Sequence, residues 1–95
     1  MTHAIWKYVL DSTYGGDEVV LMPSGAKILS VAEQDGALVL WAKVDTSTAA
    51  LAGRRIYVRP TGQAYAPCNE TFVGTCLFMG GRYVVHVFDG GEVAP

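Results

Sequence analysis

The sequence predicts an all-β domain, built as a small antiparallel sandwich or a partly closed barrel of about seven short strands. Three observations lead to this prediction. Short runs that are apolar or alternate in polarity follow one another along the 95 residues, turn residues separate them at close spacing, and no long run has helical periodicity. A chain of this length rarely divides, so residues 1–95 are expected to form one domain.

Four strands are expected in the first half of the chain, at residues 4–11, 18–22, 26–34 and 37–44. Pro23-Ser24-Gly25 indicates a turn between the second and third, because proline fixes φ and glycine permits a positive value. Asp35-Gly36 predicts a hairpin between the third and fourth, since both central positions of a type I′ turn need a positive φ. Alternation should place Ile5, Lys7 and Val9 on one face of the first strand.

The second half is expected to contain three more strands. Residues 45–53 break the alternation and fit either a single helical turn, capped by Asp45 or Thr46, or a plain loop. A strand at 54–59 follows, and residues 63–71 form the longest irregular segment. Gly80-Gly81 then joins strands 72–79 and 83–89 in a hairpin, before a frayed tail at 90–95.

The run from Tyr83 to Phe88 is β-branched or aromatic at nearly every position. Because both of its faces are apolar, this strand is expected at the centre of a sheet, covered by protein on each side. His86 lies in this run and shares a face with Val84 and Phe88. A single histidine on an apolar face is usually a core residue hydrogen-bonded to the backbone, and this is the preferred interpretation.

Composition restricts the classes of partner. The chain is 51% hydrophobic and only 17% charged, against roughly 25% charged in typical globular domains. Some apolar surface is therefore expected to pack against another copy in a homo-oligomer, although a well-packed monomer is the alternative. A net charge of −2 argues against general nucleic-acid binding. No run is long enough to cross a bilayer, and no signal peptide is recognised.

No catalytic motif stands out, and an enzyme is not expected. Cys68 and Cys76 are predicted to be free thiols of a reducing cytoplasm, with Cys76 a small buried apolar residue. The spacing of these cysteines and of His3 and His86 does not match the close pairs of zinc sites, so no metal or other cofactor is predicted. The glycine pairs lack the strand-to-helix context of phosphate-binding loops.

Residues 54–62 contain a cluster of arginine and tyrosine side chains that could bind a ligand. Strand alternation places Arg55, Tyr57 and Arg59 on one face, with Arg54, Ile56 and Val58 on the other. Guanidinium groups bind phosphate in a planar, bidentate manner, and a tyrosine ring can stack on a base. A short phosphorylated or nucleotide-like ligand suits this chemistry. The alternative is an edge strand whose charges protect it from aggregation.

Further motifs carry a resemblance to a known family. They are Ala4–Tyr8, Met22–Val31, Gln34–Asp45, Thr61-Gly62, Phe72–Thr75 and Val84–Phe88. Together they resemble a family of short, uncharacterised proteins encoded by tailed bacteriophages and prophages. The resemblance covers most of the chain and implies a small accessory protein that acts in the cytoplasm of an infected bacterium.

Two functional hypotheses follow. In the first, a non-enzymatic homo-oligomer sequesters a small phosphorylated or nucleotide-like signalling molecule and so counters host antiphage defence. Its ligand-binding residues would be Arg55, Tyr57, Arg59 and Thr61, with Lys7, Lys27 or Arg82 adding charge across a subunit interface. In the second, the domain binds and inhibits a host enzyme through exposed aromatic residues. Candidates for that contact are Trp6, Tyr14, Trp41 and Tyr65.

Overall fold

In the computed structural model, which describes residues 2–93, the chain forms two antiparallel sheets. The three-stranded sheet has the order β1-β4-β3, with β1 His3–Val9, β3 Lys27–Gln34 and β4 Ala37–Asp45. The four-stranded sheet has the order β2-β5-β7-β6, with β2 Gly16–Pro23, β5 Leu51–Pro60, β6 Thr71–Phe78 and β7 Tyr83–Val93. The all-β prediction is confirmed, and the architecture is a sandwich because the sheets do not close into a barrel.

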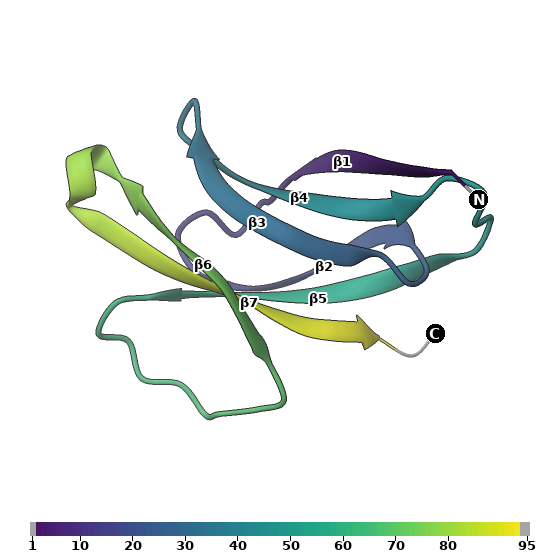
Figure 1. The fold of residues 1–95 in the computed structure, drawn as a ribbon. Helices are drawn as coiled ribbons and strands as arrows, with labels where there is room; N and C mark the ends of the chain where they lie inside the picture. Colours follow the sequence, from purple (N-terminus) through teal and green to yellow (C-terminus); the bar gives the residue numbers. More distant parts are fainter. Residues whose placement is uncertain (1, 94–95) are drawn as a thin grey trace.

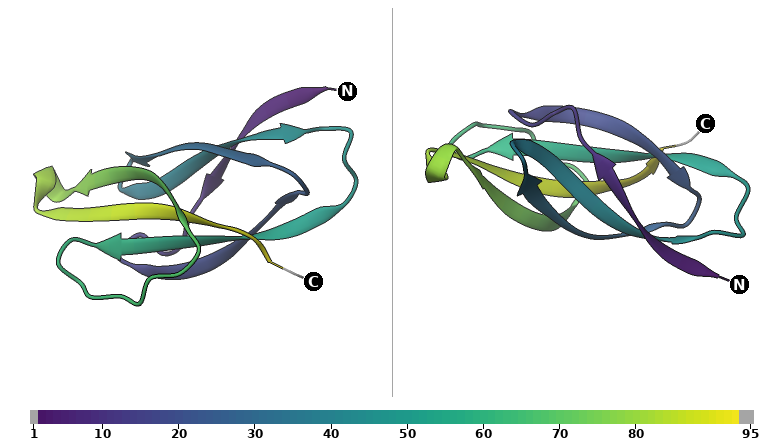
Figure 2. Two further views of the ribbon diagram at one scale, coloured as in Figure 1. Left: turned by 60° about the horizontal axis from the view of Figure 1, so that its bottom comes forward. Right: turned by 90° about the horizontal axis from the view of Figure 1, so that it is seen from above.

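The two sheets form two layers (Figures 1 and 2). The molecule measures 42 × 29 × 17 Å, and its shortest dimension corresponds to the two packed sheets. The edge strands β3 and β6 lie against each other, and a Cβ on Gly74 would stand only 3.0 Å from the Val31 side chain. The segment between β5 and β6 extends as a loop beside the four-stranded sheet (Figure 1).

The core lies between the sheets and is made by the inward-facing half of each strand. Every second residue of β4 is buried in it, and Ile56 and Val58 of β5 oppose them with Val85 and Val87 of β7. Each buried Val, Leu or Ile side chain stabilises the fold by roughly 1.5–3 kcal/mol when it leaves water. Among the described residues no polar or charged residue belongs to the buried class. Polar chemistry is therefore confined to the outer faces, the rims and the loops.

Turn chemistry agrees with the sequence at both hairpins. Asp35 and Gly36 have φ values of 52° and 83°, which fits the expected type I′ turn. The second hairpin is joined by a short 3₁₀ turn, η1 Met79–Gly81, in which Gly80 has a φ of 67°. In the part of the chain that the structure describes, no helix is long or apolar enough to cross a membrane.

Three expectations about individual segments were wrong. The helical turn considered at 45–53 is absent, because β5 already begins at Leu51, where it pairs with Pro23 of β2. The tail expected at 90–95 is a strand as far as Val93, which pairs with Gly53; residues 94–95 lie outside the described part. The strand β7 is central in its sheet as predicted, but Val84 and Phe88 remain partly exposed since no third layer covers them.

The buried Tyr8 hydroxyl lowers the stability of this fold. Tyr8 packs against the core from β1, yet its hydroxyl oxygen is buried and has no hydrogen-bond partner. Burial also raises the pKa of this phenol. Leaving a buried hydroxyl unpaired costs about 1–3 kcal/mol.

We expect Tyr8→Phe to leave stability unchanged or to raise it, because the ring remains and the unpaired hydroxyl is removed. The matched control is Tyr83→Phe, since the Tyr83 hydroxyl donates to the Tyr14 carbonyl oxygen. Thermal unfolding should show an equal or higher Tm for Tyr8→Phe and a lower Tm for Tyr83→Phe. A Tyr8→Phe variant that melts several degrees lower would mean that the hydroxyl has a partner in solution.

Candidate functional site

The arginine cluster lies on the outer face of the four-stranded sheet. In β5 the buried residues Ile56 and Val58 alternate with Arg55, Tyr57 and Arg59, which point away from the core. The predicted alternation of this strand is therefore confirmed. The alternative interpretation, an edge strand protected by its charges, is wrong, because β5 pairs with β2 on one side and with β7 on the other.

Arg59 is well enclosed on this face, with a side chain only 11% exposed. Its guanidinium carbon lies 3.7 Å from the centroid of the Tyr65 ring, 4.7 Å from that of Tyr57 and 4.9 Å from that of Phe88. A cation over aromatic faces is attracted by the ring quadrupole. These three rings therefore hold the guanidinium in place over β5 and β7.

Glu70 completes the enclosure, at the end of the loop that leads to β6. Its Oε1 accepts a hydrogen bond from Arg59 Nη1 at 2.5 Å, and its Oε2 accepts from the Cys68 backbone at 2.9 Å and thiol at 2.7 Å. Three hydrogen bonds lower the pKa of Glu70. The bond from the Cys68 thiol has the largest effect, followed by those from Arg59 and the Cys68 amide. We call Arg59, Tyr65, Cys68 and Glu70 the loop clamp.

Arg55 is paired as well, but at a more exposed position. Its Nη1 lies 2.6 Å from Asp17 Oδ2 on the neighbouring strand β2. Such surface pairs contribute little to stability, typically about 0–1 kcal/mol. Together with the loop clamp, this pair means that both outward guanidinium groups of β5 already face a carboxylate of the same chain.

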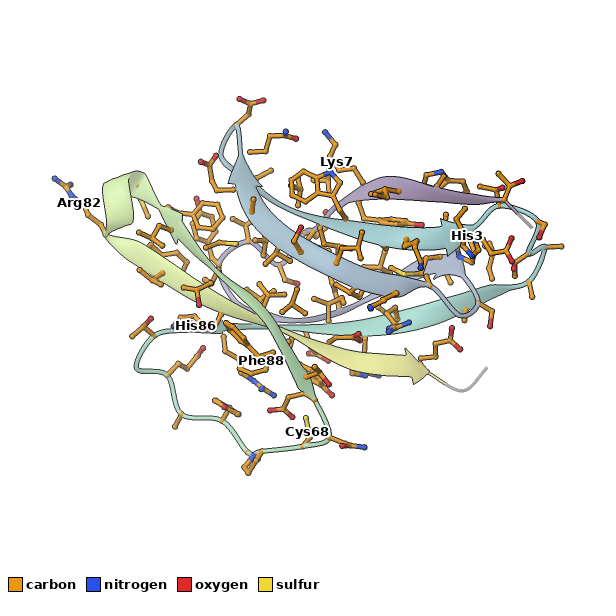
Figure 3. All side chains as sticks on the ribbon, viewed as in Figure 1. His3, Lys7, Cys68, Arg82, His86 and Phe88 are labelled. Atoms are coloured by element: carbon orange, nitrogen blue, oxygen red, sulfur yellow. The ribbon has the colours of Figure 1, made fainter. Side chains whose placement is uncertain are left out.

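The remaining predicted ligand-binding residues do not join this cluster. Thr61 follows β5, and its hydroxyl lies 2.7 Å from His86 Nε2. Lys7 is on β1, in the other sheet, and Arg82 is exposed beside the η1 turn. Figure 3 shows Lys7, Arg82 and Cys68 at three separate places on the molecule. Within a single copy of the chain, three of the candidates thus form one cluster on β5, and the others lie apart from it.

The expectation that His86 belongs to the core was wrong. The residue is on the outer face of β7 and is partly exposed, because alternation gives the inward positions to Val85 and Val87. Its two ring nitrogens lie 2.7 Å from the Thr61 hydroxyl and 3.0 Å from the Thr75 hydroxyl. The ring therefore connects the start of the loop to β6 through side chains, where a backbone partner was expected.

Arg54 makes an ion pair that sequence reasoning missed. Its Nε and Nη2 donate to the two carboxylate oxygens of Asp89 at 2.9 and 2.8 Å, and its Nη1 donates to the Ala26 carbonyl oxygen. Burial alone would raise the pKa of Asp89, but the hydrogen bonds from Arg54 and Gly91 and the Arg54 charge lower it. This pair ties β5 and β7 to the turn before β3, so its role is structural.

The cysteines and acidic residues form no metal centre in residues 2–93, where no group of three or more potential ligands gathers. Both cysteines are free; Cys76 is buried in the core, as predicted, and Cys68 is exposed. No enclosed pocket is present in the same part of the chain. The outward arginines of the four-stranded sheet are paired with carboxylates of the same chain.

The fold and this face define the protein as a small two-sheet β-sandwich with a clamped loop on one face. The chain belongs to the family described as a domain of unknown function (DUF7352), whose model matches residues 1–95. No curated protein and no solved structure matches this chain significantly.

We expect protonation of Glu70 to release the loop clamp. The pKa of Glu70 is lowered in the folded state, so its stabilising contribution is present above the usual glutamate pKa of about 4.3 and disappears as pH falls through the folded value. An NMR titration of the Cys68 amide should show a transition with its midpoint below that usual value. Glu70→Gln should abolish the transition, and Glu18→Gln should retain it. A midpoint at the usual glutamate value would show that the clamp is not formed in solution.

Proposed function

We propose that this protein is a non-enzymatic binding module that acts through protein–protein contacts made by the outer faces and edges of its sheets. The observation that carries the proposal is that the outward arginines of the four-stranded sheet are paired within the chain while large apolar side chains are left exposed. The outward arginines of β5 are paired with Asp17 and Glu70, whereas many large apolar side chains are exposed. A surface of that kind favours contact with another protein over capture of a free anion.

One group of exposed apolar residues is compact and uncharged. Leu21 and Leu51 are 65% and 64% exposed, and Val19 is exposed beside them. Leu21 pairs with Gly53, which has no side chain, and Leu51 occupies the next outward position of β5. We call Val19, Leu21 and Leu51 the leucine patch.

The leucine patch suits a second copy of the same chain. In a two-fold dimer the same surface must face itself, so an uncharged apolar patch meets its copy without like-charge repulsion. Two of its residues, Val19 and Leu21, lie on β2, an edge strand with only one hydrogen-bonded neighbour. The low charged fraction of the chain supports the same proposal.

We expect the protein to be a homo-oligomer at micromolar concentration, measured by light scattering after size-exclusion chromatography. The double variant Leu21→Asn/Leu51→Asn should shift the mass toward the monomer, because it replaces apolar contact by desolvated amides. Leu77→Asn is the control, since Leu77 is also exposed but lies on β6. A monomeric wild-type protein would contradict self-association.

The further partner is proposed to be a host enzyme, in line with the resemblance to phage-encoded proteins. Of the aromatic residues predicted for such a contact, Tyr65 is engaged in the loop clamp, and Tyr14 contacts the rings of Phe78 and Tyr83. Trp41 is partly exposed on the outer face of β4, and Trp6 is 43% exposed on the edge strand β1. The two tryptophans are therefore the aromatic residues that support contact through the three-stranded sheet.

Capture of a nucleotide-like signalling molecule is the second candidate function. It is favoured by one observation, the three rings that surround Arg59 on a single sheet face. A phosphate would have to displace the Glu70 carboxylate from Arg59 to bind there.

We expect this second function, if it operates, to be strengthened by Glu70→Gln, because the competing carboxylate is removed. A thermal-shift panel of cyclic and ADP-ribose-derived nucleotides should then give larger shifts for Glu70→Gln than for wild type, and none for Arg59→Gln. Asp17→Asn serves as the control for loss of a carboxylate on the same sheet face. The absence of any nucleotide-induced shift in both wild type and Glu70→Gln would remove nucleotide capture as a function.

A further inference from the structure

The outer face of the three-stranded sheet differs in charge from the face that carries the arginines. All three lysines of the chain, Lys7, Lys27 and Lys43, are exposed on its strands. Lys43 alternates with the buried residues Ala42 and Val44, so it points away from the core. The lysines share this face with Ile5, Val9 and Trp41, and we call these six residues the lysine face. Figure 3 shows Lys7 on the opposite side of the sandwich from Cys68.

Two of these lysines are held directly opposite each other. Lys27 of β3 pairs with Lys43 of β4 across the antiparallel ladder. Like charges at such positions destabilise a strand pair. Lys7 pairs with Trp41, the next outward residue of β4, and its ammonium group donates to the neutral Gln34 side chain at 2.8 Å. The face therefore concentrates positive charge.

A β-bulge creates the opposed pair. The register that begins at the Asp35-Gly36 turn would pair Lys27 with Val44 and direct it toward the core. The shift between Ile28 and Ser30 places Lys27 opposite Lys43 instead. Bulges of this kind redirect side chains at sheet edges. The local geometry thus brings a second lysine to the outer face, at a position where it repels the first.

No carboxylate within residues 2–93 forms a salt bridge with Lys27 or Lys43. The three salt bridges of this part all use arginines, with Asp17, Glu70 and Asp89 as their partners. Asp45 lies at the end of the same face, but its Oδ1 accepts hydrogen bonds from the Ser47 amide and hydroxyl. The exposed lysines of this face are thus free to meet carboxylates from outside the chain.

We propose that the lysine face docks an acidic segment of a partner protein in which carboxylates alternate with aliphatic side chains. This inference rests on the proposed function, protein–protein contact, and identifies the surface and the chemistry of its partner. Ile5 and Val9 are 63% and 61% exposed, and with the lysines they match such a segment in both charge and polarity. A second copy does not fit here, because the lysine face would meet its own charges.

The aliphatic residues also favour protein over single-stranded nucleic acid as the partner. Sites for single strands combine positive charge with several aromatic rings on which bases stack. The lysine face offers one ring, that of Trp41, which is only partly exposed.

The test uses defined probes with the 95-residue chain. Fluorescence anisotropy is measured with a labelled peptide of alternating Glu and Val, a Lys-Val peptide of equal length, and an oligothymidylate. We expect the Glu-Val peptide alone to bind, with an affinity that falls as salt rises. Lys27→Gln/Lys43→Gln should weaken it on the order of tenfold, the equivalent of two weak charge contacts. Arg82→Gln is the matched control, since Arg82 is another exposed cation that forms no salt bridge in the described residues.

Three outcomes would overturn the inference. Either the Glu-Val peptide fails to bind, the oligothymidylate binds as tightly as the peptide, or the double lysine variant binds the peptide as tightly as wild type does. The double variant should fold with an unchanged or higher Tm, because its substitution removes the like-charge pair, so lost binding cannot be attributed to unfolding. Retained self-association with no peptide binding would reject only this inference. A monomer that captures no partner would instead contradict the proposed function.

Discussion

The structure depends on the contact between two sheets that exclude water from a single apolar layer. Leu38 and Leu40 from one sheet meet Ile56, Val58 and Val85 from the other, and no polar residue of the described part is classed as buried among them. Because each strand has only two faces, a side chain either fills this layer or stands on the outside. The constraint divides the charges of the molecule between two outer surfaces and the rims.

These two surfaces use positive charge in opposite ways. On the four-stranded sheet, Arg55 and Arg59 are held by Asp17 and Glu70, so the cations serve to fix a loop and a strand pair. On the three-stranded sheet, Lys27 and Lys43 face each other with no carboxylate between them. The first arrangement contributes to the fold, and the second costs stability that the proposed acidic partner would offset. This contrast underlies both proposals for the function.

Strand alternation made the larger part of the fold predictable. Alternating side chains indicate β1 and β5 and the two faces of each, and the Asp35-Gly36 turn indicates the hairpin of β3 and β4. The loop clamp was not predictable, because residues 63–70 have no periodicity and Arg59 meets Glu70 only through the path of the loop. His86 was misplaced for a related reason: its neighbours are apolar, but a two-layer fold leaves one face of β7 without cover. The bulge before Ser30 has no sequence signal that places Lys27 beside Lys43.

The position of Cys68 has a practical consequence. It is the only exposed thiol in residues 2–93, because Cys76 lies in the core. Its Sγ donates to Glu70 and lies 3.7 Å from Arg59, so alkylation at this sulfur would remove a hydrogen-bond donor and add bulk next to the guanidinium. A maleimide dye therefore attaches at one defined place, but it also perturbs the network that it would be used to observe.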